Sequence, residues 1–471
     1  MNKTKQTAKY VLADFSTAFI AWGLFFIYRK FKIEPYYLED IQNILQDTKL
    51  HLGLMLVPLF WLTTYTLSGY YRKIYRKSRL EELKNTIAMC FSGVLVLFFL
   101  LILDDFITNY KNYYQAFFVL FGIHFTLTYA FRFIITTTTA HKIHNRIIGF
   151  RTIIIGSNHN AVNIYTEIEN QKVSNGNKFV GFVTANGEGN YPLNEFLPRL
   201  GSFADLKSVI TKHNIEEVII AIEENEHKKI QKIITELEDH DVVIKIIPDM
   251  QDILVGAVKM SSIYQAPLIL ISPDLMPAWQ LSVKRFLDIL TSSICLILLS
   301  PLLLFLAFGV KRSSKGPVFY SHIRIGYKGR PFRIYKFRSM YIGSENGTPL
   351  LSSKEDPRIT NFGRFMRKYR LDELPQFYNV LIGNMSLVGP RPERQHFIDE
   401  IVKRAPQYKL LHKVKPGITS WGQVKFGYAE NVDQMIERTK FDLLYIENMS
   451  LATDVKILLY TILIIIKGDG Q

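Results

Sequence analysis

Cysteine is scarce in this chain, where only Cys90 and Cys295 occur among 471 residues. Both lie in apolar stretches, and neither has a second Cys or a His at metal-ligand spacing. The pattern argues against a disulfide framework and against a zinc site. A small-residue cleavage site is also lacking after the first apolar run, which follows Lys3, Lys5 and Lys9. We expect this run to be a retained membrane anchor rather than a cleaved signal peptide.

Acidic residues are outnumbered, because 42 Asp and Glu stand against 57 Lys and Arg and give a formal net charge of +15. Much of the excess lies in residues 311–370, which hold 15 Lys and Arg against three acids. Such a segment predicts an anionic partner such as nucleic acid, anionic lipid or a phosphorylated substrate, or else a solvated basic face beside a membrane. The length predicts roughly two to four domains.

Four apolar segments fill the first 140 residues, and each approaches the ~20 residues that a helix needs to cross a bilayer. They cover about residues 10–28, 50–70, 85–103 and 114–135. Buried helices of a soluble domain are the alternative. Basic residues gather in the second loop and after the fourth segment, whereas the third loop holds Asp104 and Asp105. The positive-inside rule therefore predicts that the N-terminus, the second loop and everything after residue 140 lie in the cytosol.

Residues 151–250 change character, because short β-branched runs alternate with helical patterns and predict a small parallel α/β sheet. The first strand ends in Gly156-Ser-Asn158-His-Asn-Ala161. In the dinucleotide-binding pattern G-x-G-x-x-G/A, the second glycine has no Cβ and so lets the pyrophosphate approach the backbone. This chain has Asn158 at that position. The turn is a weak cofactor signal, and a structural or regulatory domain is the favoured interpretation.

A proline-containing linker is predicted over residues 251–281, and a fifth apolar stretch follows from Phe286 to Val310. Basic residues flank this stretch on both sides, so both ends look cytosolic. Ser300-Pro301 lies in its middle, and proline kinks or breaks a helix. A helix that bends and returns to the same face fits these facts. An ordinary crossing helix remains the alternative.

Chemistry-bearing residues gather after this stretch. Residues 332–338 alternate apolar and basic side chains, as in a half-buried strand that presents cations to phosphate. Asp372 and Glu373 then stand beside four basic residues, at the expected start of a helix. They either cap that helix and balance charge, or one is a nucleophile kept ionised by guanidinium groups while the other holds Mg²⁺.

Two stiff loops and an apolar stretch complete the chain. Arg391 lies between Pro390 and Pro392, so the loop presents it with little loss of entropy, although a tight turn explains the same residues. Residues 415–423 form a second rigid loop. Residues 454–467 are apolar but short for crossing, and they suit an interfacial helix.

Residues 282–467 closely resemble the catalytic domain of bacterial polyprenyl-phosphate phosphoglycosyl transferases, the monotopic superfamily with one re-entrant membrane helix. The order and spacing of several motifs over about 185 residues carry this resemblance. They are Lys284-Arg285-Phe286 with Asp288, Ser300-Pro301, Tyr335-Lys-Phe-Arg-Ser-Met340, Leu371-Asp-Glu-Leu-Pro-Gln376, Gly389-Pro-Arg-Pro392, Pro416-Gly-Ile-Thr419 and the series Asp442, Tyr445, Ser450 and Asp454. The whole layout is similar to the long family members, which have four N-terminal helices and a degenerate nucleotide fold.

The resemblance implies roles for individual residues. Asp372 is expected to be the nucleophile, and Glu373, together with Asp372, is expected to hold Mg²⁺. Expected phosphate or substrate contacts are Arg367, Arg391, Lys336, Arg338 and Lys415. Ser300 and Pro301 are expected to break the re-entrant helix, and Lys284 and Arg285 to contact lipid headgroups. The family commonly has Arg at position 415 and Gly at 420, where this chain has Lys415 and Ser420. Lysine keeps the positive charge but cannot make the bidentate hydrogen bonds to phosphate that arginine makes.

These expectations give a multi-domain membrane protein: a four-helix transmembrane bundle (1–145), a degenerate Rossmann-like α/β domain (146–250), the linker (251–281) and a mixed, mainly α catalytic domain (282–471) with a re-entrant helix (284–311). The implied reaction moves a hexose-1-phosphate, with glucose or galactose favoured, from a UDP-sugar to undecaprenyl phosphate, and starts exopolysaccharide, capsule or O-antigen synthesis. The bacterial inner membrane, a cytosolic catalytic domain and a homodimer are expected, and nucleic acid is not. The alternatives are a membrane-anchored nucleotide-sugar modifying enzyme and a non-catalytic assembly scaffold.

Overall fold

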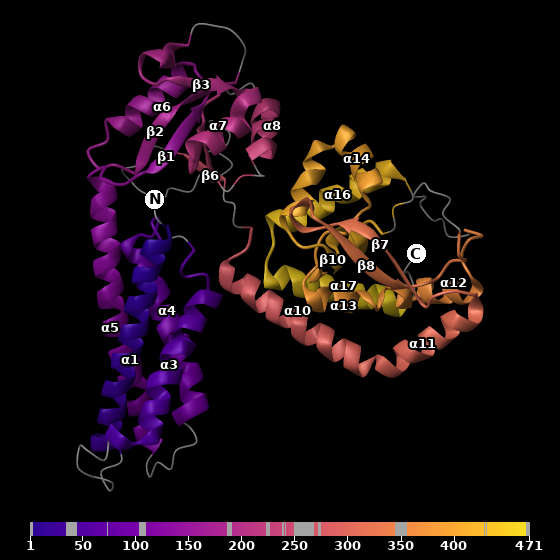
Figure 1. Cartoon of the computed structure of the whole chain (residues 1–471), viewed down its shortest axis with the longest axis horizontal. Coiled ribbons are helices and arrows are strands. Elements are labelled where there is room, and N and C mark those ends of the chain that lie inside the picture. Colours follow the sequence, from indigo (N-terminus) through magenta and orange to yellow (C-terminus); the bar gives the residue numbers. More distant parts are fainter. Residues whose placement is uncertain are drawn as a thin grey trace. The chain divides into compact units, whose positions relative to one another are not determined.

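The structure is a computed structural model of the whole chain. It describes residues 3–33, 45–72, 74–102, 110–185, 191–222, 227–237, 240, 242–248, 268–271, 275–343, 356–427, 429 and 431–467. The chain forms two compact units. The first unit consists of Met1–Asn225 and Val243–Ile271, and the second consists of Glu226–Val242 and Ser272–Gln471. Figure 1 shows the elements of both units.

The first unit contains a bundle of apolar helices. Within the described residues, four helices are long and apolar enough to cross a membrane. They are α1 (Lys3–Lys32), α3 (Thr48–Leu67), α4 (Arg79–Leu97, continued by the π-helix η2, Phe98–Ile102) and α5 (Tyr110–His144). All four expected segments are confirmed as helices. The predicted orientation of the bundle stays a prediction, and Asp104 and Asp105 lie outside the described residues.

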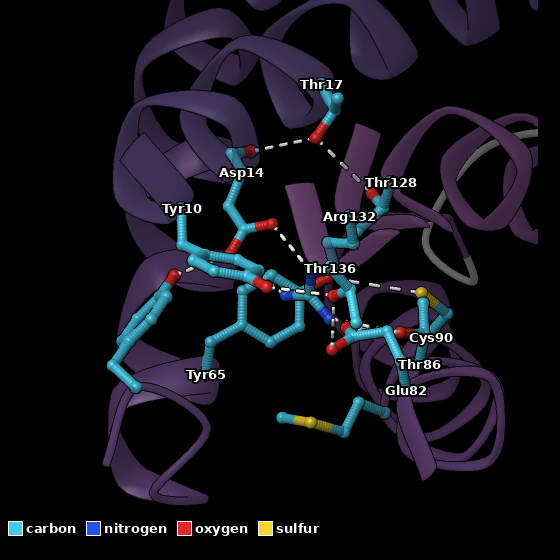
Figure 2. A network of polar contacts seen from close by, with 12 residues as sticks. Tyr10, Asp14, Thr17, Tyr65, Glu82, Thr86, Cys90, Thr128, Arg132 and Thr136 are labelled. Atoms are coloured by element: carbon cyan, nitrogen blue, oxygen red, sulfur yellow. Dashed lines mark hydrogen bonds and ion pairs between the residues drawn. The ribbon is translucent and has the colours of Figure 1, made fainter. Parts of the chain in front are cut away.

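An ion pair lies inside the bundle. The Arg132 guanidinium on α5 donates from Nε and Nη2 to the two carboxylate oxygens of Asp14 on α1, at 2.8 and 2.9 Å, and its side chain is 0% exposed. Tyr71 donates to the same carboxylate at 2.7 Å, and Arg132 also donates to Thr86 on α4 at 3.3 Å. Figure 2 shows Arg132 at the centre of this network. One guanidinium therefore joins three helices, and the apolar surroundings make the pair costly to break.

Hydrogen bonds continue the network along α5, where the buried polar residues recur at helical spacing. Thr136 bonds Tyr10 at 2.9 Å, whereas Thr128 bonds Thr17 at 3.4 Å and His124 bonds Tyr65 at 3.0 Å. The first two contacts join α1 to α5 (Figure 2), and the third joins α3 to α5. Interhelical hydrogen bonds of this kind fix which helix faces meet.

The same unit contains the α/β sheet, whose strand order is β3-β2-β1-β4-β5-β6. All neighbouring pairs are parallel except β5 with β6, so the predicted parallel α/β region is confirmed. Buried β-branched side chains fill β1 and β4, as strands covered on both faces require. The strands are β1 (Phe150–Ile155), β2 (Asn177–Thr184), β3 (Arg199–Ser202), β4 (Glu217–Ile220), β5 (Val243–Ile246) and β6 (Ile269–Ile271). Among the described residues, α6 (His159–Glu169) and α7 (Leu206–His213) are the α-helices between these strands in the first unit, and α8 (His227–Leu237), which lies between β4 and β5 in the sequence, belongs to the second unit.

The turn after β1 is explained by packing. Gly156 has φ +130°, and a Cβ there would lie 2.0 Å from the backbone oxygen of Ala221. Asn158 caps α6, because its side chain accepts from the backbone N–H of Ala161 at 3.1 Å. Close strand approach and helix capping therefore account for both residues without a bound nucleotide.

The loop between α3 and α4 contacts the sheet. Arg76 forms an ion pair with Glu217 at 2.9 Å and lies 4.2 Å from the ring centre of Phe150, at the amino ends of β4 and β1. Glu217 is buried and also accepts from Asn177 at 2.8 Å. The carboxyl ends of the strands, where α/β sheets bind ligands, lie at the opposite edge.

The longer segment of the second unit, Ser272–Gln471, contains a bent helix pair near its start. Helices α10 (Ala278–Leu298) and α11 (Ser300–Ser313) meet at 63°. Pro301 lies in the first turn of α11, and the Ser300 hydroxyl donates to the carbonyl of Ile297 at 2.7 Å. Both arms pack on the same folded domain, α10 on α13 (Gln376–Ile382) and α11 on α12 (Asn361–Lys368) (Figure 1). The predicted break at Ser300-Pro301 is therefore a bend in the structure.

The rest of this unit is mostly helical, as predicted, with two small sheets. Antiparallel strands β7 (Phe319–Ile325) and β8 (Pro331–Phe337) form a hairpin, and β9 (Ser386–Val388) pairs with β10 (Gly417–Thr419) in parallel. The remaining helices are α14 (Gln395–Arg404), η8 (Pro406–Lys413), α15 (Trp421–Lys425), α16 (Val432–Glu447) and α17 (Leu451–Lys467). Most of the predicted linker 251–281 lies outside the described residues, and α10 already begins at Ala278.

Removing one partner of the buried Asp14–Arg132 pair is expected to destabilise the bundle by about 3–5 kcal/mol, because an uncompensated charge stays buried. Thermal unfolding of Asp14→Leu and Arg132→Met in mild detergent measures the effect. The exposed Phe131→Ala on α5 is the control. The double variant Asp14→Leu/Arg132→Met should recover much of the loss. Single variants no less stable than Phe131→Ala would contradict the assigned role.

Candidate functional site

Asp372 and Glu373 lie side by side in a tight turn, η7 (Leu371–Glu373), between α12 and α13. Each is only 8% exposed. The turn starts at Arg370, whose φ of 55° is left-handed, a conformation that is uncommon for residues other than glycine. Backbone of this kind persists where the surrounding structure fixes it, and it clusters at functional sites.

The expectation that Asp372 caps the following helix is wrong. Helix α13 begins at Gln376, with Pro375 at its N-cap position. The left-handed Arg370 closes a separate short turn first, so neither carboxylate reaches the helix start as a cap. Helix capping therefore does not explain the acid pair, whereas the balance of local charge stays an alternative to a catalytic role.

Cations surround Glu373. Lys336 Nζ donates to its Oε1 at 2.6 Å, and Arg391 Nη2 lies 3.4 Å from the same oxygen. Arg370 Nη1 lies 3.7 Å from Oε2. Burial acts to raise the pKa of Glu373, but these cations outweigh it and hold that pKa well below its ordinary value. Burial lowers the pKa of Lys336, opposed by Glu373.

Asp372 has a different electrostatic environment. Burial, and then the charge of Glu373, raise the pKa of its carboxyl above the ordinary value, while Lys336 and Arg367 oppose the rise. Arg367 is held by the Ser339 hydroxyl, to which its Nε donates at 2.9 Å. The carboxylate that the guanidinium and ammonium groups keep most firmly ionised is thus Glu373, and not the expected nucleophile.

Strand β8 aims Lys336 at the acid pair. Asn379 on α13 is fully buried; its side-chain oxygen accepts from Tyr335 N at 3.1 Å and its amide donates to Arg333 O at 2.8 Å. These two bonds fix β8 against α13, directly after the turn that carries Asp372 and Glu373. Asn379 could not be found from the sequence, because its partners are backbone groups more than 40 residues away.

The loop carrying Arg391 is clamped by Glu393. This buried carboxylate accepts from Arg324 on β7 at 2.6 Å and from Arg438 on α16 at 2.7 Å. Arg324 also donates to the carbonyl of Pro392 at 2.9 Å. Although burial acts to raise the pKa of Glu393, the two arginines lower it. Two proline-restricted positions and two ion pairs therefore hold the loop in one conformation.

Two expected phosphate ligands make other contacts. Arg338 is buried, and its Nη2 donates to the carbonyl and hydroxyl of Ser314 at 2.7 and 3.1 Å. Lys415 lies near Arg285, and burial and Arg285 lower its pKa. Lys336, Arg367 and Arg391 thus lie beside the acid pair. Arg338 instead contacts Ser314, and Lys415 lies near Arg285. A contact of Arg338 or Lys415 with substrate stays a prediction.

The expected headgroup residues are tied to the protein. Lys284 pairs with Asp454 on α17 at 2.5 Å and donates to Val388 O at 2.9 Å. Arg285 donates to the carbonyls of Val380 and Leu381 at 2.7 and 2.9 Å, at the end of α13. Both residues thus hold α10 on the domain, and their contact with lipid stays a prediction.

Comparison with known protein families gives two matches. Residues 279–468 match the family described as bacterial sugar transferase, and residues 67–248 match the family described as CoA-binding domain. The first match contains the whole cluster around Asp372 and Glu373.

Three curated relatives illustrate the similarity. The chain is 36% identical to UDP-glucose:undecaprenyl-phosphate glucose-1-phosphate transferase of Klebsiella pneumoniae, over 56% of this chain and 57% of that protein. It is 42% identical to UDP-N-acetylgalactosamine-undecaprenyl-phosphate N-acetylgalactosaminephosphotransferase of Aeromonas hydrophila, over 48% and 52%. It is 32% identical to undecaprenyl-phosphate galactose phosphotransferase of Salmonella typhimurium, over 68% and 69%. The chain spans little more than half the length of the first two relatives.

Glu393→Gln is expected to destabilise the second unit by about 3–5 kcal/mol, because Arg324 and Arg438 then face each other without a shared carboxylate. Chemical denaturation of the purified protein in detergent measures the change. The matched control is Glu437→Gln, since Glu437 forms an exposed pair with Lys440, and it should change stability by about 0–1 kcal/mol. Equal effects of the two substitutions would contradict the clamp.

Proposed function

Because the chain belongs to the bacterial sugar transferase family, we propose that it transfers a hexose-1-phosphate from a UDP-sugar to undecaprenyl phosphate. The observation that carries the proposal is the buried pair Asp372 and Glu373 with Lys336, Arg367 and Arg391 beside it. A nucleophile next to a carboxylate that fixed cations hold, with Lys336 and Arg367 acting on its own charge, suits a transfer that mainly needs positioning and charge stabilisation. Glucose and galactose are the hexoses that we expect.

The proposed reaction has two steps. An Asp372 carboxylate oxygen attacks the β-phosphorus of the UDP-sugar, and the bond to the bridging oxygen breaks, so that UMP leaves with the electron pair. A phosphate oxygen of undecaprenyl phosphate then attacks the phosphorus of the aspartyl-phosphosugar. The carboxylate of Asp372 leaves unchanged, and the product is undecaprenyl-diphosphate-hexose. Lys336 and Arg391 face the transferred phosphate, and Arg367 approaches from α12.

Magnesium fits the two carboxylates. No group of three or more His, Cys, Asp or Glu is arranged as a metal site in the described part of the chain. Mg²⁺ is commonly held by one or two carboxylates and completed by substrate phosphates and water, so Asp372 and Glu373 would suffice. When bound, the ion would neutralise diphosphate charge and favour the ionised form of Asp372.

The bent pair α10–α11 supports a re-entrant arrangement in the membrane. Side chains at the bend are apolar and strongly exposed, with Ile297 at 75%, Leu298 at 73% and Leu304 at 73%. Both arms return to one folded domain, as a helix that enters and leaves the same face requires. A bilayer would cover these side chains and bring the site to the depth of the lipid phosphate. We place this face in the cytosol, at the bacterial inner membrane.

The rival functions receive less support. A nucleotide-sugar modifying enzyme built on the α/β sheet would need a glycine-rich turn, whereas Gly156 and Asn158 serve packing and capping. A non-catalytic scaffold has no need for two buried carboxylates surrounded by cations, which are unfavourable to bury. Release of UMP from a panel of UDP-sugars, with and without undecaprenyl phosphate, separates the three. The modifying enzyme predicts sugar conversion without lipid, and the scaffold predicts no release.

Asp372→Asn is expected to abolish lipid-linked sugar formation, a loss of at least about 10³-fold, because the amide is a poor nucleophile. The assay follows radiolabelled sugar into the lipid phase, and thermal unfolding checks the fold. The control is Asp399→Asn on the exposed side of α14, which should keep activity. Near-wild-type turnover of Asp372→Asn would overturn the assignment of the nucleophile.

Cysteines placed at Trp279 and Lys315, one at each end of the bent pair, are expected to react with a membrane-impermeant maleimide from the cytosolic side only. The background carries Cys90→Ser and Cys295→Ser. Intact cells and inverted vesicles provide the two sides. Labelling of the position-315 variant in intact cells would show a crossing helix instead.

A further inference from the structure

The hairpin β7–β8 carries aromatic side chains on the face that holds Lys336. In its register, Tyr320 pairs directly with Lys336 and His322 pairs with Ile334. Directly opposite residues lie on one face with Cβ atoms about 4.5–5.5 Å apart. Lys336 reaches Glu373 from this face, so Tyr320 and His322 belong to the same surface as the acid pair.

The rings of Tyr320 and His322 contact each other, with their centres 5.3 Å apart and a tilt of 35°. His322 is neutral there, because Arg324 Nε donates to its Nε2 at 2.7 Å and that nitrogen must carry the lone pair. Burial, and then Arg324, Arg394, Lys336 and Arg391, lower the pKa of His322 to about 2. The imidazole is therefore an uncharged neighbour that contacts the Tyr320 ring on the same face of the hairpin.

The clamped loop reaches the same ring. Arg394 follows Glu393, whose carboxylate is held by two arginines, and its Nη2 donates to the Tyr320 hydroxyl at 3.3 Å. Arg391, three residues earlier, lies beside Glu373. One rigid loop thus links the acid pair at one end with an aromatic ring, 39% exposed, at the other.

We propose that Tyr320, supported by His322, is the platform on which the uracil ring of the nucleotide sugar stacks, with Arg394 beside the adjoining phosphate. The proposal rests on the proposed function. Of the three parts of that substrate, the base alone has a planar π face, and stacking on aromatic rings is the usual way of holding it. If the β-phosphate lies at Lys336 and Arg391, the α-phosphate separates it from the uridine. The uridine then lies toward Arg394, which adds a cation next to the α-phosphate.

The position of Tyr320 predicts where the nucleotide and the hexose of the substrate bind. The nucleotide lies along the hairpin face, and the hexose then lies on the other side of the transferred phosphate. Removal of the ring should weaken the binding of UMP, the product that contains the base, and leave the acceptor lipid unaffected.

The test measures UMP as an inhibitor of the full-length enzyme and, separately, UMP binding to the purified protein by calorimetry. Tyr320→Ala and Tyr320→Leu are expected to weaken UMP binding and to raise KM for the UDP-sugar by about fivefold or more, which is the range for loss of one base–aromatic stack. KM for undecaprenyl phosphate should not change. Tyr320→Phe keeps the ring and should stay within about twofold of wild type.

The matched control is Tyr327→Ala, because Tyr327 is 42% exposed in the turn of the same hairpin. Unchanged UMP binding in both Tyr320→Ala and Tyr320→Leu would overturn the proposal. A shift in the preference between UDP-glucose and UDP-galactose without a change in UMP binding would show that the Tyr320 ring contacts the hexose. A raised KM for undecaprenyl phosphate would show that the ring contacts the acceptor. Either result would overturn the proposal. A wild-type enzyme that releases UMP from no UDP-sugar would instead refute the proposed function.

Discussion

The second unit depends on the balance between two adjacent buried carboxylates and the cations that compensate them. Isolated carboxylates are strongly unfavourable in a low-dielectric interior. Lys336, Arg391 and Arg370 stabilise Glu373 directly, so the strand, the loop and the turn that carry them must meet at one point. The charge requirement thus explains why the left-handed turn at Arg370 is retained and why β8 is fixed to α13 through Asn379.

A second charge cluster supports the first. Glu393 binds Arg324 and Arg438, and it thereby holds the loop that carries both Arg391 and Arg394. Because Arg324 also fixes His322, the same contacts define the aromatic face of the hairpin. Preorganisation of this kind matters for phosphoryl transfer, since fixed donors need no rearrangement as the reaction proceeds. The membrane bundle uses a similar arrangement for stability, with Arg132 and Asp14 as its buried pair.

The sequence predicts the elements better than their contacts. The length of the apolar runs predicted the four helices, the alternation of β-branched runs with helical patterns predicted the parallel sheet, and the alternation of apolar and basic residues predicted the strand at Lys336. Adjacent acids among arginines marked Asp372 and Glu373. The start of α13 was misjudged because Asp372 and Pro375 both suit a helix start, and the left-handed Arg370 has no sequence signature. The resemblance placed Arg338 among the phosphate contacts; its Nη2 donates to a hydroxyl and a carbonyl of Ser314, which the sequence did not reveal, and its contact with substrate stays a prediction. Asn379 and the pair Asp14–Arg132 join distant segments, which a single sequence does not reveal.

The proposed mechanism requires Asp372 to form a covalent bond to phosphorus. Mass spectrometry of the full-length enzyme, quenched after incubation with a UDP-hexose in the absence of undecaprenyl phosphate, tests it most directly. We expect an added hexose-phosphate mass on the peptide containing Asp372, and this mass should disappear when undecaprenyl phosphate is supplied. Lipid-linked product formed at the normal rate with no adduct at any time, or an adduct on another residue, would contradict it.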